Sequence, residues 1–214
     1  MNRPIRLMTA ALAASAALLL TACGSGGGDK DSSDKIEGAG GGGSKASASP
    51  SEKPHGAKRP EIKLPAEFEA NFAGWTNSDP KLQGVLDDGK EELRAKYAAI
   101  IEANPDSDAV AFYDSGASLT TARKWIKGFT DTDDSLIGSI KAYSPKVNVS
   151  GKDAAVFFYC VDERKASTKN SKTKKVTATP DTPESVLQYR ARLTKSEQGV
   201  WQTVSLETVP GGCK

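Results

Sequence analysis

Residues 24–64 contain so little apolar side-chain area that they cannot take part in a packed core. Glycine occurs there as Gly26-Gly27-Gly28 and again in a run from 40 to 43, and polar residues and proline fill most of the rest. A segment of this composition cannot offset the entropy cost of becoming ordered. The glycines are not a phosphate-binding loop, because no Gly-Lys-Ser/Thr follows them. We therefore predict a disordered tether over 23–64 and one packed domain over 65–214, a length that suits a single core.

An export leader precedes the tether. Arg3 and Arg6 form a cationic start, and residues 7–20 form an apolar stretch that is too short to cross a bilayer, which needs about 20 residues. The stretch ends in Leu20-Thr21-Ala22-Cys23. This ending resembles the lipobox of bacterial lipoproteins.

The lipoprotein resemblance implies that residues 1–22 are removed as a signal peptide. It also implies that Cys23 carries diacylglycerol on its sulfur and a further acyl chain, such as palmitate, on its amine. Two or three chains hold a protein firmly on a membrane, whereas one does not. We therefore expect a secreted protein that is lipid-anchored at the extracytoplasmic face of the cell membrane. The alternative is an ordinary cleaved signal, with Cys23 as an incidental thiol.

Removal of the leader changes the charge balance. The sequence has 29 Lys and Arg against 27 Asp and Glu, and loss of Arg3 and Arg6 leaves 27 of each sign. From this balance we expect no affinity for nucleic acid. The single histidine, His55, lies in the tether, so the domain lacks the residue used in Ser-His-Asp catalysis and in most zinc sites. We expect no metal and no cofactor.

The spacing of apolar residues predicts helices in the first half of the domain. Ser78 or Asp79 can cap a long helix that ends at Asn104-Pro105. A short helix is expected over 107–115, and a third is expected to begin at Ser118. The acidic pairs at 87–88 and 91–92 are expected to form an exposed face of the first helix.

The second half of the domain has the alternating pattern of strands. Four strands are expected, over 140–149, 154–162, 185–193 and 200–209, and a long polar connection is expected over 163–183. The strand over 154–162 is apolar on both faces, so we expect it to be central and covered on both sides. Helices followed by a meander of strands define the α+β class.

This order of elements resembles the NTF2-like (SnoaL/cystatin-cone) lipoproteins of bacteria. The resemblance rests on Tyr159-Cys160-Val161-Asp162, on Thr173-Lys174-Lys175-Val176 and on Gly199-Val200-Trp201-Gln202-Thr203, and it covers residues 67–214. It implies N-terminal helices packed in a curved antiparallel four-stranded sheet that forms an open cone. Such cones bind ligands, dimerise and in some cases catalyse reactions, so the fold does not by itself determine the function.

The cysteine count agrees with export. With Cys23 taken by lipid, Cys160 and Cys213 are left as an even pair in an oxidising compartment. We predict a structural disulfide that fastens the C-terminus to the sheet. A redox-active pair is the alternative, but the chain has no Cys-X-X-Cys motif.

Two groups of residues are candidates for contacts with other molecules. Aromatic side chains that could line a ligand pocket are Tyr113, Trp125 and Tyr189. The basic stretch over 164–175 could contact anionic envelope material, and its candidate residues are Lys172, Lys174 and Lys175.

We expect a protein that binds a small apolar ligand or an envelope protein and does not catalyse a reaction. One alternative is a cone-type isomerase, cyclase or hydratase that uses a Tyr/Asp pair, such as Tyr113-Asp114 or Tyr159 with Asp162. The other is a structural spacer. An all-apolar cavity would favour binding, whereas a buried carboxylate facing a tyrosine would favour an enzyme.

Overall fold

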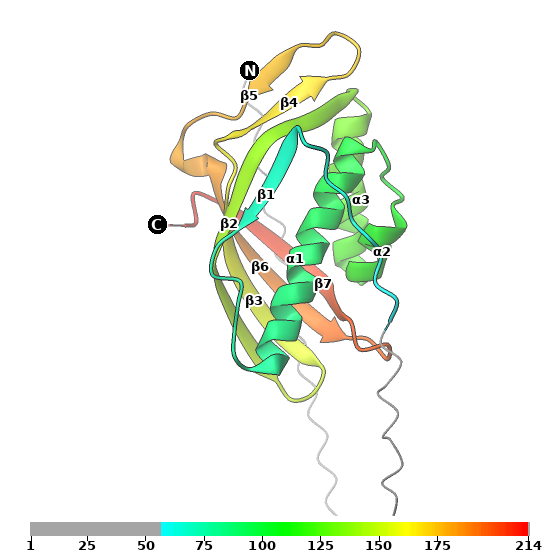
Figure 1. Ribbon diagram of the computed structural model, residues 1–214, viewed down its shortest axis with the longest axis vertical. Helices are drawn as coiled ribbons and strands as arrows, with labels where there is room; N and C mark the ends of the chain where they lie inside the picture. Colours follow the sequence, from blue (N-terminus) through cyan, green and yellow to red (C-terminus); the bar gives the residue numbers. More distant parts are fainter. Residues whose placement is uncertain (1–56, 214) are drawn as a thin grey trace, which may run out of the picture. The chain divides into compact units, whose positions relative to one another are not determined.

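The computed structural model describes residues 57–213 and places three α-helices on one side of a curved sheet (Figure 1). In chain order the elements are β1 (Phe68–Phe72), α1 (Pro80–Ile101), α2 (Asp108–Tyr113), α3 (Gly116–Thr130), β2 (Asp134–Ser150), β3 (Ala154–Asp162), β4 (Ala166–Asn170), β5 (Val176–Ala178), a 3-10 turn (Pro183–Ser185), β6 (Val186–Lys195) and β7 (Trp201–Pro210). The predicted α+β class is confirmed. The leader, Cys23 and the tether up to residue 56 lie outside the described residues.

The sheet is organised by β2, whose 17 residues pair in turn with β4, β1 and β3. Its seven strands follow the order β5-β4-β2-β3-β6-β7, with β1 added in parallel to β2 and every other pair antiparallel. The pairing of β2 with β3 shifts register between Tyr143 and Lys146. Ser144-Pro145 lies at this shift, because proline has no N–H to donate to a neighbouring strand.

The expectation of four strands is wrong, because β1, β4 and β5 also belong to the sheet. The expected polar connection over 163–183 contains the hairpin β4–β5, whose strands carry Ser, Thr and Lys more than apolar residues. Hydrophobic alternation therefore could not reveal it. The strand expected over 140–149 begins earlier, at Asp134, where it pairs with Asn170 of β4.

The start of α1 follows the predicted capping. The carboxylate of Asp79 accepts a hydrogen bond from the N–H of Lys81 at 2.8 Å, and Pro80 occupies the first turn. Gly89 lies where α1 crosses β3, and a Cβ at this position would lie 2.6 Å from Cε1 of Phe157. Close packing of helix on sheet thus offsets the low helix propensity of this glycine.

The start of α3 differs from the prediction. This helix begins at Gly116 after Ser115, not at Ser118. The hydroxyl of Ser118 is buried and donates a hydrogen bond to Asp114 Oδ1 at 2.6 Å. The side chain is therefore used in the interior and is not available as a cap.

The two faces of β3 have different surroundings. The residues that point toward the helices are all buried: Ala155, Phe157, Tyr159 and Val161. On the other face Val156 and Phe158 are 37% and 38% exposed. The expectation that both faces are covered is wrong, because the helices lie on one side of the sheet only (Figure 1).

Residues 57–64, which composition assigns to the tether, pack on the domain. Ile62 is buried, and Arg94 Nη2 donates a hydrogen bond to its carbonyl at 2.8 Å. Arg59 donates two hydrogen bonds to Asp88, at 2.8 and 3.1 Å. Asp88 also accepts from the backbone N–H of Trp201 at 2.9 Å. Asp88 is therefore a buried junction of this segment, α1 and β7, and its expected exposure is wrong.

The chain ends in a crosslink to the sheet. Cys160 on β3 and Cys213 after β7 form a disulfide with a Cα–Cα distance of 6.0 Å, as predicted. Cys160 pairs with Gln188 of the neighbouring strand β6. The bridge therefore ties the end of the chain to a central strand.

Candidate functional site

A pocket of about 240 Å³ lies between α1, α3 and the strands β6 and β7. Its lining residues are Leu93, Lys96, Ser118, Thr121, Ala122, Trp125, Glu163, Leu187, Tyr189, Leu206 and Thr208. Apolar walls with a few convergent polar groups are typical of small-molecule sites. Cavities of roughly 150 Å³ admit benzene, and drug-sized ligands occupy about 300–1,000 Å³. The pocket therefore suits a small molecule.

The structure brings two of the three predicted aromatic residues to this pocket. Trp125 on α3 packs edge-on against Phe129, with ring centroids 5.6 Å apart. Tyr189 on β6 stacks on Tyr159 of β3 at 4.9 Å. Tyr113 does not line the pocket: it is buried at the end of α2. The walls are thus held in place by further aromatic rings of the core.

Glu163 is the carboxylate of the pocket wall. It directly follows β3, and its Oε1 accepts a hydrogen bond from the hydroxyl of Tyr97 at 3.1 Å. Burial raises the pKa of Glu163, and the bond from Tyr97 opposes the shift. Burial and the nearby carboxylate raise the pKa of Tyr97 well above its usual value. A carboxyl group with a raised pKa can accept or donate a hydrogen bond, so Glu163 can orient the polar end of a ligand.

Below the pocket lies a buried charged cluster of Glu92, Lys96 and Asp114. The ammonium group of Lys96 forms an ion pair with Glu92 Oε1 and lies 3.1 Å from Asp114 Oδ1. The residues are 2%, 3% and 1% exposed, so the expectation that Glu92 is solvated is wrong. Lys96 connects α1 to the start of α3, since Asp114 also accepts from Ser118.

The protonation of this cluster reflects its burial. Burial raises the pKa of Glu92 to about 7, with Lys96 opposing and Asp114 adding to the shift. Burial alone would lower the pKa of Lys96, but the two carboxylates outweigh it and raise that pKa. Lys96 is therefore held as a cation in the pocket wall, and the carboxylates of Glu92 and Asp114 compensate its charge.

Neither Glu163 nor the charged cluster was predicted from the sequence, although the spacing of residues on α1 contained a signal for the cluster. On α1, Glu92 and Lys96 follow the apolar stripe of Val85 and Gly89 at intervals of three and four residues. Those positions lie on the face that packs in the core. A charged pair on a core stripe predicts a buried ion pair. Glu163 has no comparable signal, because it lies just beyond a strand.

The Tyr/Asp pairs considered for catalysis are not assembled. Asp162 binds the guanidinium of Arg164 at 2.7 Å, and Asp114 binds Lys96. Among residues 57–213, no group of three or more His, Cys, Asp and Glu side chains is arranged to hold a metal ion. In the same part of the chain, none of the helices has the length and apolar character needed to cross a membrane.

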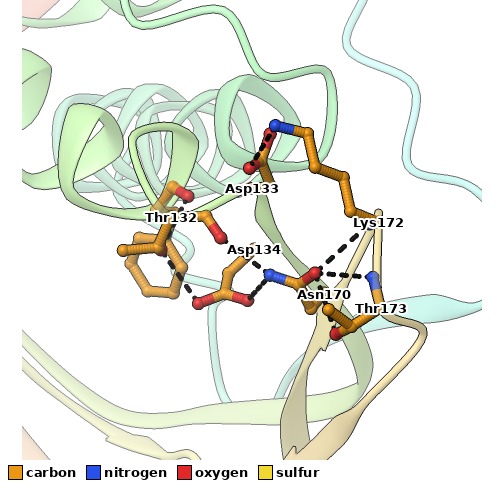
Figure 2. A network of polar contacts seen from close by, with 7 residues as sticks. Thr132, Asp133, Asp134, Asn170, Lys172 and Thr173 are labelled. Carbon is orange, nitrogen blue, oxygen red and sulfur yellow. Dashed lines mark hydrogen bonds and ion pairs between the residues drawn. The ribbon is translucent and has the colours of Figure 1, made fainter.

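Most of the basic stretch lies on the hairpin β4–β5, whose turn docks on the turn between α3 and β2. Figure 2 shows the contacts: the amide nitrogen of Asn170 donates to the carbonyl of Thr132 at 2.7 Å and to Asp134 Oδ1 at 2.9 Å. Lys172 Nζ lies 2.8 Å from Asp133 Oδ2. The hairpin is therefore anchored at its tip.

The three lysines proposed for contact with anionic material differ in their surroundings. Lys172 is engaged with Asp133, and Lys174 Nζ donates to the carbonyl of Ser171 at 2.6 Å. The Lys175 side chain has no hydrogen bond or ion pair with other described residues. The hairpin thus presents less free positive charge than its composition suggests.

No protein-family model matches this sequence, and no curated protein sequence matches it. Solved structures with similar folds include the intermembrane space region of the chloroplast protein ARC6, with 9% identity and a TM-score of 0.41 over 63% of this chain and 99% of that one. A ketosteroid isomerase-like protein from Erwinia carotovora atroseptica has 18% identity and a TM-score of 0.42 over 61% of this chain and 95% of its own.

A proposed ketosteroid isomerase from Shewanella frigidimarina has 11% identity and a TM-score of 0.35 over 64% of this chain and 98% of its own. Two of these three neighbours are thus ketosteroid isomerase-like proteins. At such low TM-scores they identify no activity for this chain. Its pocket has to be interpreted from its own residues.

Proposed function

We propose that this protein is a lipid-anchored extracytoplasmic lipoprotein whose NTF2-like domain binds a small, largely apolar molecule. The pocket beside Trp125 and Tyr189 carries the proposal, because its wall is mainly apolar and includes a few polar groups, among them Glu163. Apolar area supplies most of the affinity, at roughly 25 cal/mol per Å², and Glu163 orients the polar end. Lys96 is less available to a ligand, because two carboxylates already hold it.

The binding proposal can be tested by filling the pocket. Ala122 is buried in the pocket wall on α3, whereas Ala117 is exposed on the same helix. In native mass spectrometry of protein from its own host, we expect the wild type and Ala117→Leu to retain a small molecule. We expect Ala122→Leu to lose it, because the added side chain occupies the cavity.

Indole serves as a defined probe in the same experiment, and we expect Ala122→Leu to weaken its binding at least tenfold. Equal binding by both leucine variants would contradict the pocket. If the wild type retains no molecule and does not bind indole, the small-molecule proposal is wrong. The protein would then bind an envelope protein or act as a spacer.

A second candidate function is proton transfer in the same pocket, and one observation favours it. Glu163 is a partly buried carboxylate that accepts a hydrogen bond from Tyr97, and a carboxylate facing a tyrosine is the arrangement expected of a cone-type enzyme. Glu163→Gln keeps the shape of the side chain and removes its acid–base chemistry. If the retained molecule is a substrate, this variant binds it but does not convert it.

The lipid anchor has its own test in Cys23→Ala. In the native host, we expect this variant to incorporate no labelled fatty acid and to accumulate as unprocessed precursor or as shed protein, because no thiol remains to receive the lipid. The matched control is Ser25→Ala, which changes a residue near the anchor position and leaves the leader, Cys23 and the disulfide intact. If Cys23→Ala still partitions into detergent like the wild type, the anchor proposal is wrong.

A further inference from the structure

A second pocket, of about 270 Å³, lies at the end of the domain where the described chain begins. Three lysines from separate parts of the chain line it: Lys81 at the start of α1, Lys152 in the turn between β2 and β3, and Lys195 at the end of β6. Nζ of Lys195 lies 5.6 Å from the ring centroid of Trp201, which also lines the pocket. These turns lie together at one end of the molecule (Figure 1).

The positive charge of this pocket is not compensated within the described residues. Asp88 is the one carboxylate of the lining, and Arg59 holds it through two hydrogen bonds. Among residues 57–213, none of the three lysines forms an ion pair. Three lysines that form no ion pair with the described residues therefore line one open cavity.

The hairpin β4–β5 at the opposite end of the domain is different, although its sequence is more basic. Lys172 pairs with Asp133 at 2.8 Å, and Lys169 lies 3.6 Å from Glu67. Several of its cations are thus neutralised by the domain itself. The lysine pocket is the better candidate for an external anion.

The chain reaches the folded domain beside the lysine pocket. The N–H of Ala57 donates to the carbonyl of Gln198, in the turn between β6 and β7, at 3.4 Å. Arg59 lies in the pocket lining. Residues 24–56 connect this point to Cys23. A lipid on Cys23 is therefore attached through the same end of the domain that carries the three lysines.

We infer that Lys81, Lys152 and Lys195 bind the phosphate of an anionic phospholipid headgroup, so that this end of the domain faces the membrane. The inference rests on the proposed anchoring through Cys23. Ammonium groups bind phosphate as point charges, and a surface of anionic lipid attracts each nearby lysine.

The test uses residues 24–214, which retain every described residue and lack both the leader and Cys23. Binding to vesicles of phosphatidylglycerol with phosphatidylcholine is measured by flotation, with pure phosphatidylcholine vesicles for comparison. One variant combines Lys81→Gln, Lys152→Gln and Lys195→Gln. The matched control combines Lys165→Gln, Lys174→Gln and Lys175→Gln, which removes equal charge from the other end of the domain.

We expect wild type and control to bind the anionic vesicles and the pocket variant to bind about 100-fold more weakly, since each lysine near an anionic surface contributes about fivefold. Binding should also fall with salt. A control variant that loses as much affinity, or no preference for anionic vesicles, overturns the inference. Displacement of the protein from the vesicles by soluble glycerol phosphate, at a concentration equal to that of the anionic lipid, also overturns the inference. Because this protein lacks Cys23, these results do not depend on the anchor, which the fatty-acid label tests separately.

Discussion

Lys96→Met is expected to lower the free energy of unfolding at pH 7 by about 3–5 kcal/mol, the usual cost of leaving a buried charge without its partner. Lys96 is 3% exposed and faces the carboxylates of Glu92 and Asp114. Without the ammonium group, both carboxylates stay in the interior with no cation between them. Urea denaturation followed by tryptophan fluorescence measures the change.

The loss is expected to depend on pH, and the direction follows from Glu92. Burial raises the pKa of Glu92 to about 7 in the folded protein, against an ordinary value of 4.5. The folded state therefore binds a proton that the unfolded state has lost, and this stabilisation is complete below pH 4.5 and disappears as the pH rises through 7. Removal of Lys96, which opposes this shift, raises the pKa further. The variant should thus lose less stability at pH 5 than at pH 8.

Two further variants make this prediction specific. Lys124→Met removes a lysine that is exposed on α3, and it should change stability by less than about 0.5 kcal/mol. Lys96→Met combined with Glu92→Leu removes the Glu92–Lys96 ion pair as a unit and should recover part of the loss, since Asp114 still lacks its cation. Equal stability of Lys96→Met and Lys124→Met at pH 8 would show that the cluster is not buried as described.

Removal of the Cys160–Cys213 disulfide is expected to lower the free energy of unfolding by about 4 kcal/mol, because the bridge closes a loop of 53 residues in the unfolded chain. It also fastens the residues after β7 to the central strand β3. Peptide mapping without reductant should find one linked peptide and no free thiol in residues 57–213. Denaturation curves of Cys160→Ser/Cys213→Ser measure the energy.

The single variants provide the control for this crosslink. If the effect comes from the bridge, Cys160→Ser, Cys213→Ser and the double variant all lose about the same stability, since each removes the same crosslink. A wild-type protein whose two thiols react with alkylating reagent before reduction would contradict the disulfide. Additive losses from the two single variants would instead assign the effect to local packing.

The sequence alone was enough to predict features that depend on local or global composition. The α+β class, a cap of α1 at Ser78 or Asp79 and the cysteine pair follow from periodicity, backbone chemistry and cysteine count. The four apolar strands of the prediction correspond to β2, β3, β6 and β7. These features are visible in the sequence because each depends on neighbouring residues or on side-chain alternation.

The tertiary structure decided the features that depend on residues far apart in sequence. The polar hairpin β4–β5 forms because β2 extends beyond its pairing with β3 and offers the hairpin an edge, which no alternation could reveal. Asp88 looks like a solvated helix residue until Arg59 and Trp201 are placed against it, and Lys96 gains Asp114 as a second partner only in the folded domain. Glu163 joins a pocket with Trp125 and Tyr189 because α3, β6 and the end of β3 meet there. Charge burial and pocket formation require partners from separate elements, and only folding brings those partners within contact distance.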